Sequence, residues 1–318
     1  MNVVEVKALA ERIRAETAKA VIGQADTVDL LLTALFSGGH VLLEGPPGAA
    51  KTFLAQCFAR TVALDFGRIQ FTPDLMPGDV VGANLFNFQT NAFTLVKGPI
   101  FCELLLTDEI NRAPPKTQAA LLEAMQERTV TLDGESHALS PRFMVVATQN
   151  PIEQQGTYPL PEAQLDRFLF KHVLAYPSFA EEVAIVATHG ARNGQPAAAD
   201  FGVEPVADAA TISAAVAATA AVRLTPEIVE DVVNLVRATR ESADLAVGAS
   251  PRSAAALALA ARARATLDGR DYAIPDDVKA LALPALRHRV ILSPAAEIEG
   301  RRVDEVIAGL VNLVEAPR

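Results

Sequence analysis

The sequence contains no tryptophan, only two cysteines, and no apolar run approaching the length of a membrane span. A helix that crosses a bilayer needs about 20 consecutive apolar residues, so the sequence argues against a membrane span. Cys57 and Cys102 lack metal-ligand spacing, and we expect buried thiols rather than a disulfide. The N-terminus mixes charged and apolar residues and lacks the basic start and apolar centre of a signal peptide. These absences predict a soluble cytoplasmic protein.

Basic residues are outnumbered, with 28 Lys and Arg against 38 Asp and Glu and a formal net charge of −10. Proteins that bind nucleic acids usually present a basic face, so this balance argues against nucleic acid as a partner. Two short basic clusters remain, Arg287-His288-Arg289 and Arg301-Arg302. We expect both clusters to lie on a solvated face.

The chain of 318 residues is long enough for two domains. Through residues 1–176, short apolar runs alternate with helical stretches, which is typical of an α/β domain with a parallel sheet covered by helices. The runs are apolar at successive positions, so we expect the strands to be buried on both faces. The predicted strands cover residues 40–44, 68–72, 104–108, 143–148 and 168–174.

The second half has a different character. Residues 177–206 are interpreted as a connecting segment, and residues 207–318 as an all-helical domain. Its helices are predicted to begin at Thr225-Pro226, Ser250-Pro251 and Pro275, where a capping residue or a first-turn proline is favourable.

Two insertions interrupt the first domain. Residues 73–99 are rich in Pro, Gly and Asn and predict a loop with a short hairpin. Residues 129–139 carry Asp133-Gly134 between alternating flanks, which is a strong hairpin signal. Each insertion is either a tolerated surface feature or a functional element, and the residues alone leave both open.

Residues 45–52 read GPPGAAKT, which matches the phosphate-binding pattern G-x-x-x-x-G-K-[ST] except that Ala50 replaces its second glycine. The loop follows a predicted strand and precedes a predicted helix, so its backbone N–H groups can cradle phosphate oxygens. Lys51 would neutralise the β- and γ-phosphates, and the Thr52 hydroxyl would bind Mg²⁺. Ala50 fits if its φ is negative, and alanine is a good helix former at a helix start. The loop alone leaves a decayed site or a chance match open.

The segment LLLTDEI delivers Asp108 and Glu109 at the end of an apolar strand, the edge at which α/β sheets bind ligands. Asp108 suits Mg²⁺, and Glu109 could polarise the attacking water as a general base. A single Asp-Glu pair can be merely structural. Combined with a lysine loop, however, it is the two-part signature of an ATPase.

Three further residues fit a shared active site. Asn150 follows another buried strand, where its amide could hold the lytic water. Arg167 precedes the last predicted strand and could stabilise phosphoryl charge, although an Asp-Arg pair is more often a surface salt bridge. Arg252 lies in the first turn of a helix, where a cation opposes the macrodipole. A phosphate could balance that charge, or the arginine could simply be solvated.

The motifs GPPGAAKT, LLLTDEINRAPPKTQAALLEAMQE, VVATQNP, YPLPEAQLDRF and SPRS occur in an order that resembles the MoxR family of AAA+ ATPases. The resemblance runs from about Val21 to the C-terminal helices, and that family commonly has alanine at the position of Ala50. It implies roles for Lys51 and Thr52 (Walker A), Asp108 and Glu109 (Walker B), Asn150 (sensor 1), Arg167 (arginine finger) and Arg252 (sensor 2). It also implies that ATP is bound by Ile22, Gly23, Gly45, Pro46, Pro47, Gly48, Ala49, Ala50, Lys51, Thr52 and Phe53.

The resemblance further implies a hexameric homo-oligomeric ring in which Arg167 acts on the neighbouring subunit's ATP. It implies a von Willebrand factor A domain partner, a protein client, and work as a chaperone-like activator that assists metal or cofactor insertion. The insertions 73–99 and 129–139 resemble the helix-2 insert and the pre-sensor hairpin. Cys102-Glu103 departs from the small or amide residues usual there, without removing any named group.

Three alternatives stay open. A magnesium-chelatase-like motor subunit would share the same insertions. A nucleotide-gated binding scaffold with little turnover is disfavoured by the intact Asp108, Glu109, Asn150 and Arg167. An enhancer-binding transcription activator is disfavoured because no DNA-binding module is appended and NAFTLVKG only faintly resembles its contact loop.

Overall fold

The computed structural model describes residues 1–89, 91–151, 156–190 and 196–314. Parts of four predictions therefore lie outside the described residues: position 90 of the first insertion, 152–155 of the first domain, 191–195 of the connecting segment and 315–318 of the helical domain.

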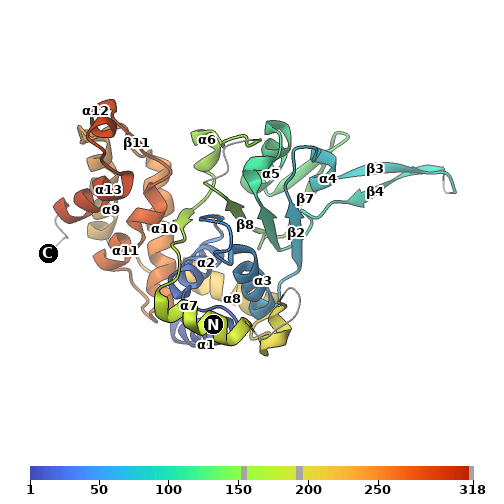
Figure 1. The fold of residues 1–318 in the computed structure, drawn as a ribbon, viewed down its shortest axis with the longest axis horizontal. Coiled ribbons are helices and arrows are strands. Elements are labelled where there is room, and N and C mark those ends of the chain that lie inside the picture. Colours follow the sequence, from blue (N-terminus) through green and yellow to red (C-terminus); the bar gives the residue numbers. More distant parts are fainter. Residues whose placement is uncertain (90, 152–155, 191–195, 315–318) are drawn as a thin grey trace.

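A five-stranded parallel sheet forms the centre of the first domain, in the order β2-β5-β8-β1-β9 (Figure 1). This confirms the predicted α/β class. The strands are β1 (Val41–Glu44), β2 (Phe66–Gln70), β5 (Leu104–Asp108), β8 (Met144–Gln149) and β9 (Phe170–Val173).

Successive side chains of the inner strands enter two different cores. Leu43, Leu104 and Val146 pack with helices α1 (Val3–Ala18), α2 (Ala25–Ser37) and α3 (Lys51–Val62). Leu42, Leu105 and Val145 pack on the other side with α5 (Pro115–Glu127). Two-sided burial explains why these strands are apolar at successive positions. The edge strand β2 is different, because Ile69 is its only buried residue, so the expectation of burial on both faces is wrong there.

Both insertions contain hairpins, as the sequence predicts. The first holds α4 (Pro77–Val81) and strands β3 (Gly82–Asn87) and β4 (Ala92–Lys97), which project from the body (Figure 1). The second is the hairpin β6 (Thr129–Leu132) and β7 (Glu135–Ala138). Its turn residues Asp133 and Gly134 have φ of 51° and 86°, the left-handed pair that a tight hairpin turn requires.

The segment between the domains also contains helical structure. It holds α7 (Phe179–His189) and the short 3₁₀ helix η2 (Ala198–Phe201), whereas α6 (Glu162–Leu165) precedes β9 within the first domain. Ser178 caps α7 by accepting a hydrogen bond from the Glu181 amide, while Glu181 bonds back to Ser178.

The second domain is helical, as predicted, apart from one short antiparallel pair, β10 (Leu245–Val247) and β11 (Ile291–Leu292). Its helices are α8 (Ala209–Ala220), α9 (Pro226–Glu241), α10 (Pro251–Leu267), α11 (Pro275–Leu286), α12 (Pro294–Ile298) and α13 (Val303–Leu313). In Figure 1 the helices α9 to α13 lie on the opposite side of the sheet from the projecting hairpin.

The basic cluster Arg287-His288-Arg289 does not lie on a solvated face, so that prediction is wrong. His288 and the side chain of Arg289 are 6% and 4% exposed, and both bind the backbone carbonyl of Phe168, between α6 and β9. Polar groups can be buried when their hydrogen bonds are satisfied within the protein, and a carboxylate supplies the counter-charge here. Arg301 and Arg302 are exposed, as expected.

Both cysteines are free and buried. Burial raises the pKa of each thiol to about 12, because the charged thiolate is disfavoured away from water. Glu103, the acid beside Cys102, pairs with Arg142 and so has a structural partner. None of the described helices is both long and apolar enough to cross a membrane.

Candidate active site

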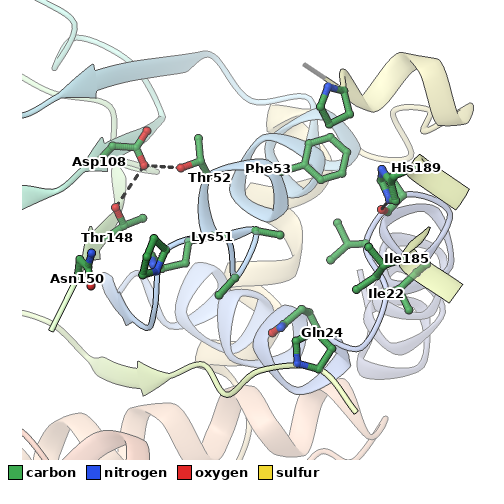
Figure 2. A pocket seen from close by; sticks show the side chains of 18 of the residues that line it. Ile22, Gln24, Lys51, Thr52, Phe53, Asp108, Thr148, Asn150, Ile185 and His189 are labelled. Atoms are coloured by element: carbon green, nitrogen blue, oxygen red, sulfur yellow. Dashed lines mark hydrogen bonds between the residues drawn. The ribbon is translucent and has the colours of Figure 1, made fainter. Parts of the chain in front are cut away.

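A cavity of about 500 Å³ lies at the carboxyl ends of β1, β5 and β8. One end is polar and is lined by Lys51, Thr52, Asp108 and Asn150 (Figure 2). Glu109, which follows Asp108, also lines the cavity. The other end is largely apolar and is lined by residues that include Ile22, Phe53, Ile185 and His189. A triphosphate at the polar end would place its nucleoside against the apolar end, so the cavity has the layout of a nucleotide site.

The loop between β1 and α3 adopts left-handed backbone at two positions, with φ of 84° at Gly48 and 57° at Ala50. The expectation of a negative φ at Ala50 is therefore wrong, and so is its placement inside the helix, because Ala50 is the residue that precedes α3. A left-handed φ costs alanine about 1 kcal/mol relative to glycine. The Ala50 carbonyl oxygen nevertheless accepts the first hydrogen bond of α3, from the Leu54 amide at 2.8 Å.

Lys51 begins α3 and folds back over the loop. Its Nζ donates hydrogen bonds to the carbonyl oxygens of Gly45 at 2.6 Å and Pro46 at 2.9 Å. Gly45 and Pro46 therefore anchor Lys51 and do not line the cavity. Gly23, which follows Ile22, does not line it either. Pro47, Gly48, Ala49 and Ala50 do line it.

Asp108 is almost fully buried and is held by three donors from three elements. Its Oδ1 accepts hydrogen bonds from Thr52 Oγ1 at 2.7 Å and Thr148 Oγ1 at 3.3 Å. Its Oδ2 accepts one from Arg68 Nε at 2.9 Å. Figure 2 shows the Asp108, Thr52 and Thr148 side chains converging. The carboxylate is thus fixed beside the phosphate loop.

Glu109 is turned away from the line of β5 by a left-handed backbone with φ of 56°. Its amide donates to Thr148 Oγ1 at 3.0 Å, and its Oε2 accepts from Gln70 Nε2 and Arg112 Nε, each at 2.9 Å. The two acidic residues therefore face different partners, as expected for different roles. Asn150 is buried and lines the same cavity, directly after β8.

The apolar end is built by α7 together with the segment that follows α1. Ile185 and His189 reach the cavity from α7, and His189 Nε2 bonds the Ala20 carbonyl oxygen at 3.1 Å. The His189 ring also contacts Phe53 edge-on, with ring centroids 5.8 Å apart. Gly23 has φ of 76°, a left-handed conformation that favours glycine, and a Cβ there would lie 2.7 Å from the flexible end of the Glu181 side chain on α7.

Arg167 and Arg252 lie outside the cavity. Arg167 Nη1 donates to the Leu122 carbonyl oxygen at 3.0 Å and to Gln126 on α5. Arg252 lies at the start of α10, 57% exposed, with its Nε 3.7 Å from Asp166. The structure therefore brings both arginines to the same α6 region and separates them from Lys51 of the same chain.

Sequence reasoning missed several residues of the site. Thr148 and Gln70 bind the acidic pair, and Arg68 binds Asp108, yet none belongs to a phosphate-loop or Asp-Glu signature. Ile185 and His189 were missed because they lie in residues 177–206, which were interpreted as a connecting segment. The capping signal Ser178-x-x-Glu181 ahead of an apolar repeat could have identified α7.

Comparisons with known proteins agree with this geometry. Residues 40–170 match the model of the ATPase family associated with various cellular activities (AAA), and residues 237–310 match the AAA lid domain. Chaperone MoxR1 of Mycobacterium tuberculosis is 41% identical over 97% of this chain and 82% of its own length. The chain belongs to the MoxR family of AAA+ ATPases.

Other relatives cover nearly the whole chain. The uncharacterized protein YeaC of Bacillus subtilis is 44% identical over 94% of this chain and 92% of its own length. Protein MoxR of Methylorubrum extorquens is 32% identical over 97% of this chain and 95% of its own. A solved structure from Cytophaga hutchinsonii, described as a candidate ATPase, matches with a TM-score of 0.90 and 37% identity over 99% and 97% of the two chains.

Membership of this family implies nucleotide binding with a divalent metal, and the residues present fit one. The Thr52 hydroxyl and Asp108 carboxylate are hard oxygen donors 2.7 Å apart. Among the described residues, no group of three or more His, Cys, Asp or Glu forms a metal cage of its own. A cation bound there would complete its shell with phosphate and water, as Mg²⁺ prefers.

Proposed function

We propose that this chain is a Mg²⁺-dependent ATPase that works as a hexameric ring, with each active site completed by Arg167 of a neighbouring subunit. The observation that carries the proposal is the separation within one chain. Lys51, Thr52, Asp108, Glu109 and Asn150 line one cavity, whereas Arg167 lies outside it, between α6 and β9, with its side chain bonded to α5. A phosphoryl-stabilising arginine in that position can serve only a site on another copy.

The residues of the cavity divide the work. The backbone of residues 45–52 holds the phosphates, and Lys51 leaves the Gly45 and Pro46 carbonyls to contact them. Thr52 and Asp108 would hold the metal, which would neutralise phosphate charge when bound. Glu109 accepts a proton from the attacking water, and Asn150 orients that water.

Arg252 is assigned, with Arg167, to the active site of the neighbouring subunit. Its partner Asp166 directly precedes Arg167. We therefore infer that Arg252, like Arg167, contacts the nucleotide of the neighbouring subunit and not that of its own chain. Ile22 and Phe53 would contact the base, and Gly23 would turn the chain beside Ile22. The relative named Chaperone MoxR1 supports work on a protein client. We extend this to a cytoplasmic activator that assists metal or cofactor insertion together with a von Willebrand factor A domain partner.

The chemistry is tested by measuring ATP binding and turnover separately. Glu109→Gln should bind ATP normally and lose turnover by about 100-fold or more, because only the proton acceptor is removed. Lys51→Ala should lose ATP affinity, and Asp108→Asn should raise the Mg²⁺ concentration required. Normal turnover by Glu109→Gln would overturn the assignment of the general base.

A further inference from the structure

Arg289 joins the helical domain to the segment that carries Arg167. Its Nε lies 2.7 Å from Asp166 Oδ1, and its Nη2 donates to the carbonyl oxygens of Asp166 at 3.1 Å and Phe168 at 2.8 Å. Its Nη1 donates to the Leu169 carbonyl oxygen at 3.2 Å. The guanidinium therefore bonds the residues on both sides of Arg167 at once.

His288 binds the same segment. Its Nε2 lies 2.9 Å from the Phe168 carbonyl oxygen, so that nitrogen carries the proton. Burial and the adjacent Arg289 charge hold the pKa of His288 well below its ordinary value, which keeps the ring neutral. Two consecutive side chains following α11 thus fix the backbone of residues 166–169.

Arg167 has few other restraints. Its Nη1 contacts α5 at Leu122 and Gln126, while its buried Nε has no hydrogen-bond partner among the described residues. The position of the guanidinium therefore depends on where residues 166–169 place its backbone. A planar fork with five donors can fix several carbonyl groups together, which a lysine ammonium on a flexible stem does less well.

We propose that Arg289 is a positioning residue that holds Arg167 in place for catalysis in the neighbouring subunit and links the position of Arg167 to the helical domain. This rests on the proposed function, in which Arg167 acts across the subunit boundary. Asp166 is the shared connection, because Arg252 and Arg289 approach different oxygens of its carboxylate. A rotation of the helical domain would then move both arginines relative to the neighbouring site.

The single variants test whether geometry matters beyond charge. Arg289→Lys and Arg289→Met should each lower turnover about tenfold, because a displaced group loses its alignment with the reacting phosphate. ATP affinity should stay within about twofold, since Arg289 does not contact the cavity. Arg301→Met is the matched control, an exposed arginine of the same domain paired with Asp244, and should leave turnover unchanged.

Mixed oligomers separate positioning from general damage. Glu109→Gln subunits keep a sound Arg167 but have a dead site of their own, whereas Arg289→Met subunits keep a sound site. An equimolar mixture should regain about a quarter of wild-type turnover, because random assembly forms the productive pairing at one interface in four. Arg167→Ala mixed with Glu109→Gln should recover equally, and Arg289→Met mixed with Arg167→Ala should not recover.

The outcomes are distinguishable. Recovery with Arg167→Ala but not with Arg289→Met would overturn the positioning role and leave the shared site standing. No recovery with Arg167→Ala would overturn the shared site, and this inference with it. Wild-type turnover in both Arg289 variants would also overturn the inference. If Arg289→Met does not fold, Arg289→Lys takes its place in the mixtures.

Discussion

Gln70 Nε2 donates a hydrogen bond to Glu109 Oε2 at 2.9 Å, and so connects the edge strand β2 to the acidic end of β5. Arg112 Nε binds the same oxygen at 2.9 Å. Both donors compete with a water molecule for the carboxylate that is proposed to act as general base. In this structure the two hydrogen bonds therefore restrict the Glu109 carboxylate.

We predict that Gln70→Ala raises basal ATP turnover about two- to fivefold, because the carboxylate becomes freer to accept a proton from water. The Gln70 side chain does not belong to the phosphate loop, so ATP affinity should change little. Turnover at saturating ATP, with ATP binding measured in parallel, checks this. Lower turnover at unchanged ATP affinity would mean that Gln70 aligns Glu109 productively instead.

The left-handed backbone at Ala50 predicts a dependence on side-chain shape. Ala50→Gly should change the free energy of unfolding by less than about 1 kcal/mol, because relief of strain offsets the greater freedom of the unfolded chain. Ala50→Val should cost about 2 kcal/mol and weaken ATP binding, because a β-branched residue resists φ of 57°.

The control is Ala255→Val, at an exposed helical position of α10, which should cost only the difference in helix propensity, about 0.6 kcal/mol. Denaturant unfolding of the three variants makes the comparison. Equal losses for Ala50→Val and Ala255→Val would show that the loop tolerates a branched side chain.

The buried His40 predicts a pH dependence of stability. Its Nδ1 accepts from the Val145 amide at 3.0 Å and its Nε2 lies 3.2 Å from the Met125 carbonyl oxygen, so the neutral ring is fully bonded. Burial lowers the pKa of His40 to about 4. Its folded pKa is below the unfolded value, so the contribution is complete above about pH 6.5 and decreases as pH falls.

Between pH 6.5 and pH 5, this one group should remove about 2 kcal/mol from the free energy of unfolding. His40→Gln keeps one acceptor and one donor but does not titrate, so its stability should fall less over the same range. Denaturant unfolding of both proteins at pH 7.5 and pH 5 tests the difference. An identical decrease in both would assign the effect to other groups, including His288, whose pKa is also lowered.

Much of the fold and part of the site could be predicted because strong local rules apply. Asp108 ends an apolar strand, Glu109 and Asn150 directly follow one, and the loop that ends at Lys51 and Thr52 follows another. Parallel strands bring their carboxyl ends to one edge of the sheet. Tertiary contacts decided what the sequence could not. In α9, Ile228 and Val232 are buried while Val229 and Val233 are not, although all four are apolar.

The same limit explains the wrong predictions. The cluster at residues 287–289 looks like a solvated charge run until the carbonyl groups that bind Arg289, far away in sequence, are known. The conformation of Ala50 depends on the whole loop rather than on its own preference. Neither signal is contained in a short sequence window.

The most direct test of the shared active site is ATP turnover per chain over a range of protein concentrations, with Arg167→Ala and Glu109→Gln measured alongside. The account predicts that turnover per chain rises with concentration as subunits assemble, and that both variants abolish it while still binding ATP. Turnover per chain that stays constant with concentration, together with full activity in Arg167→Ala, would contradict it.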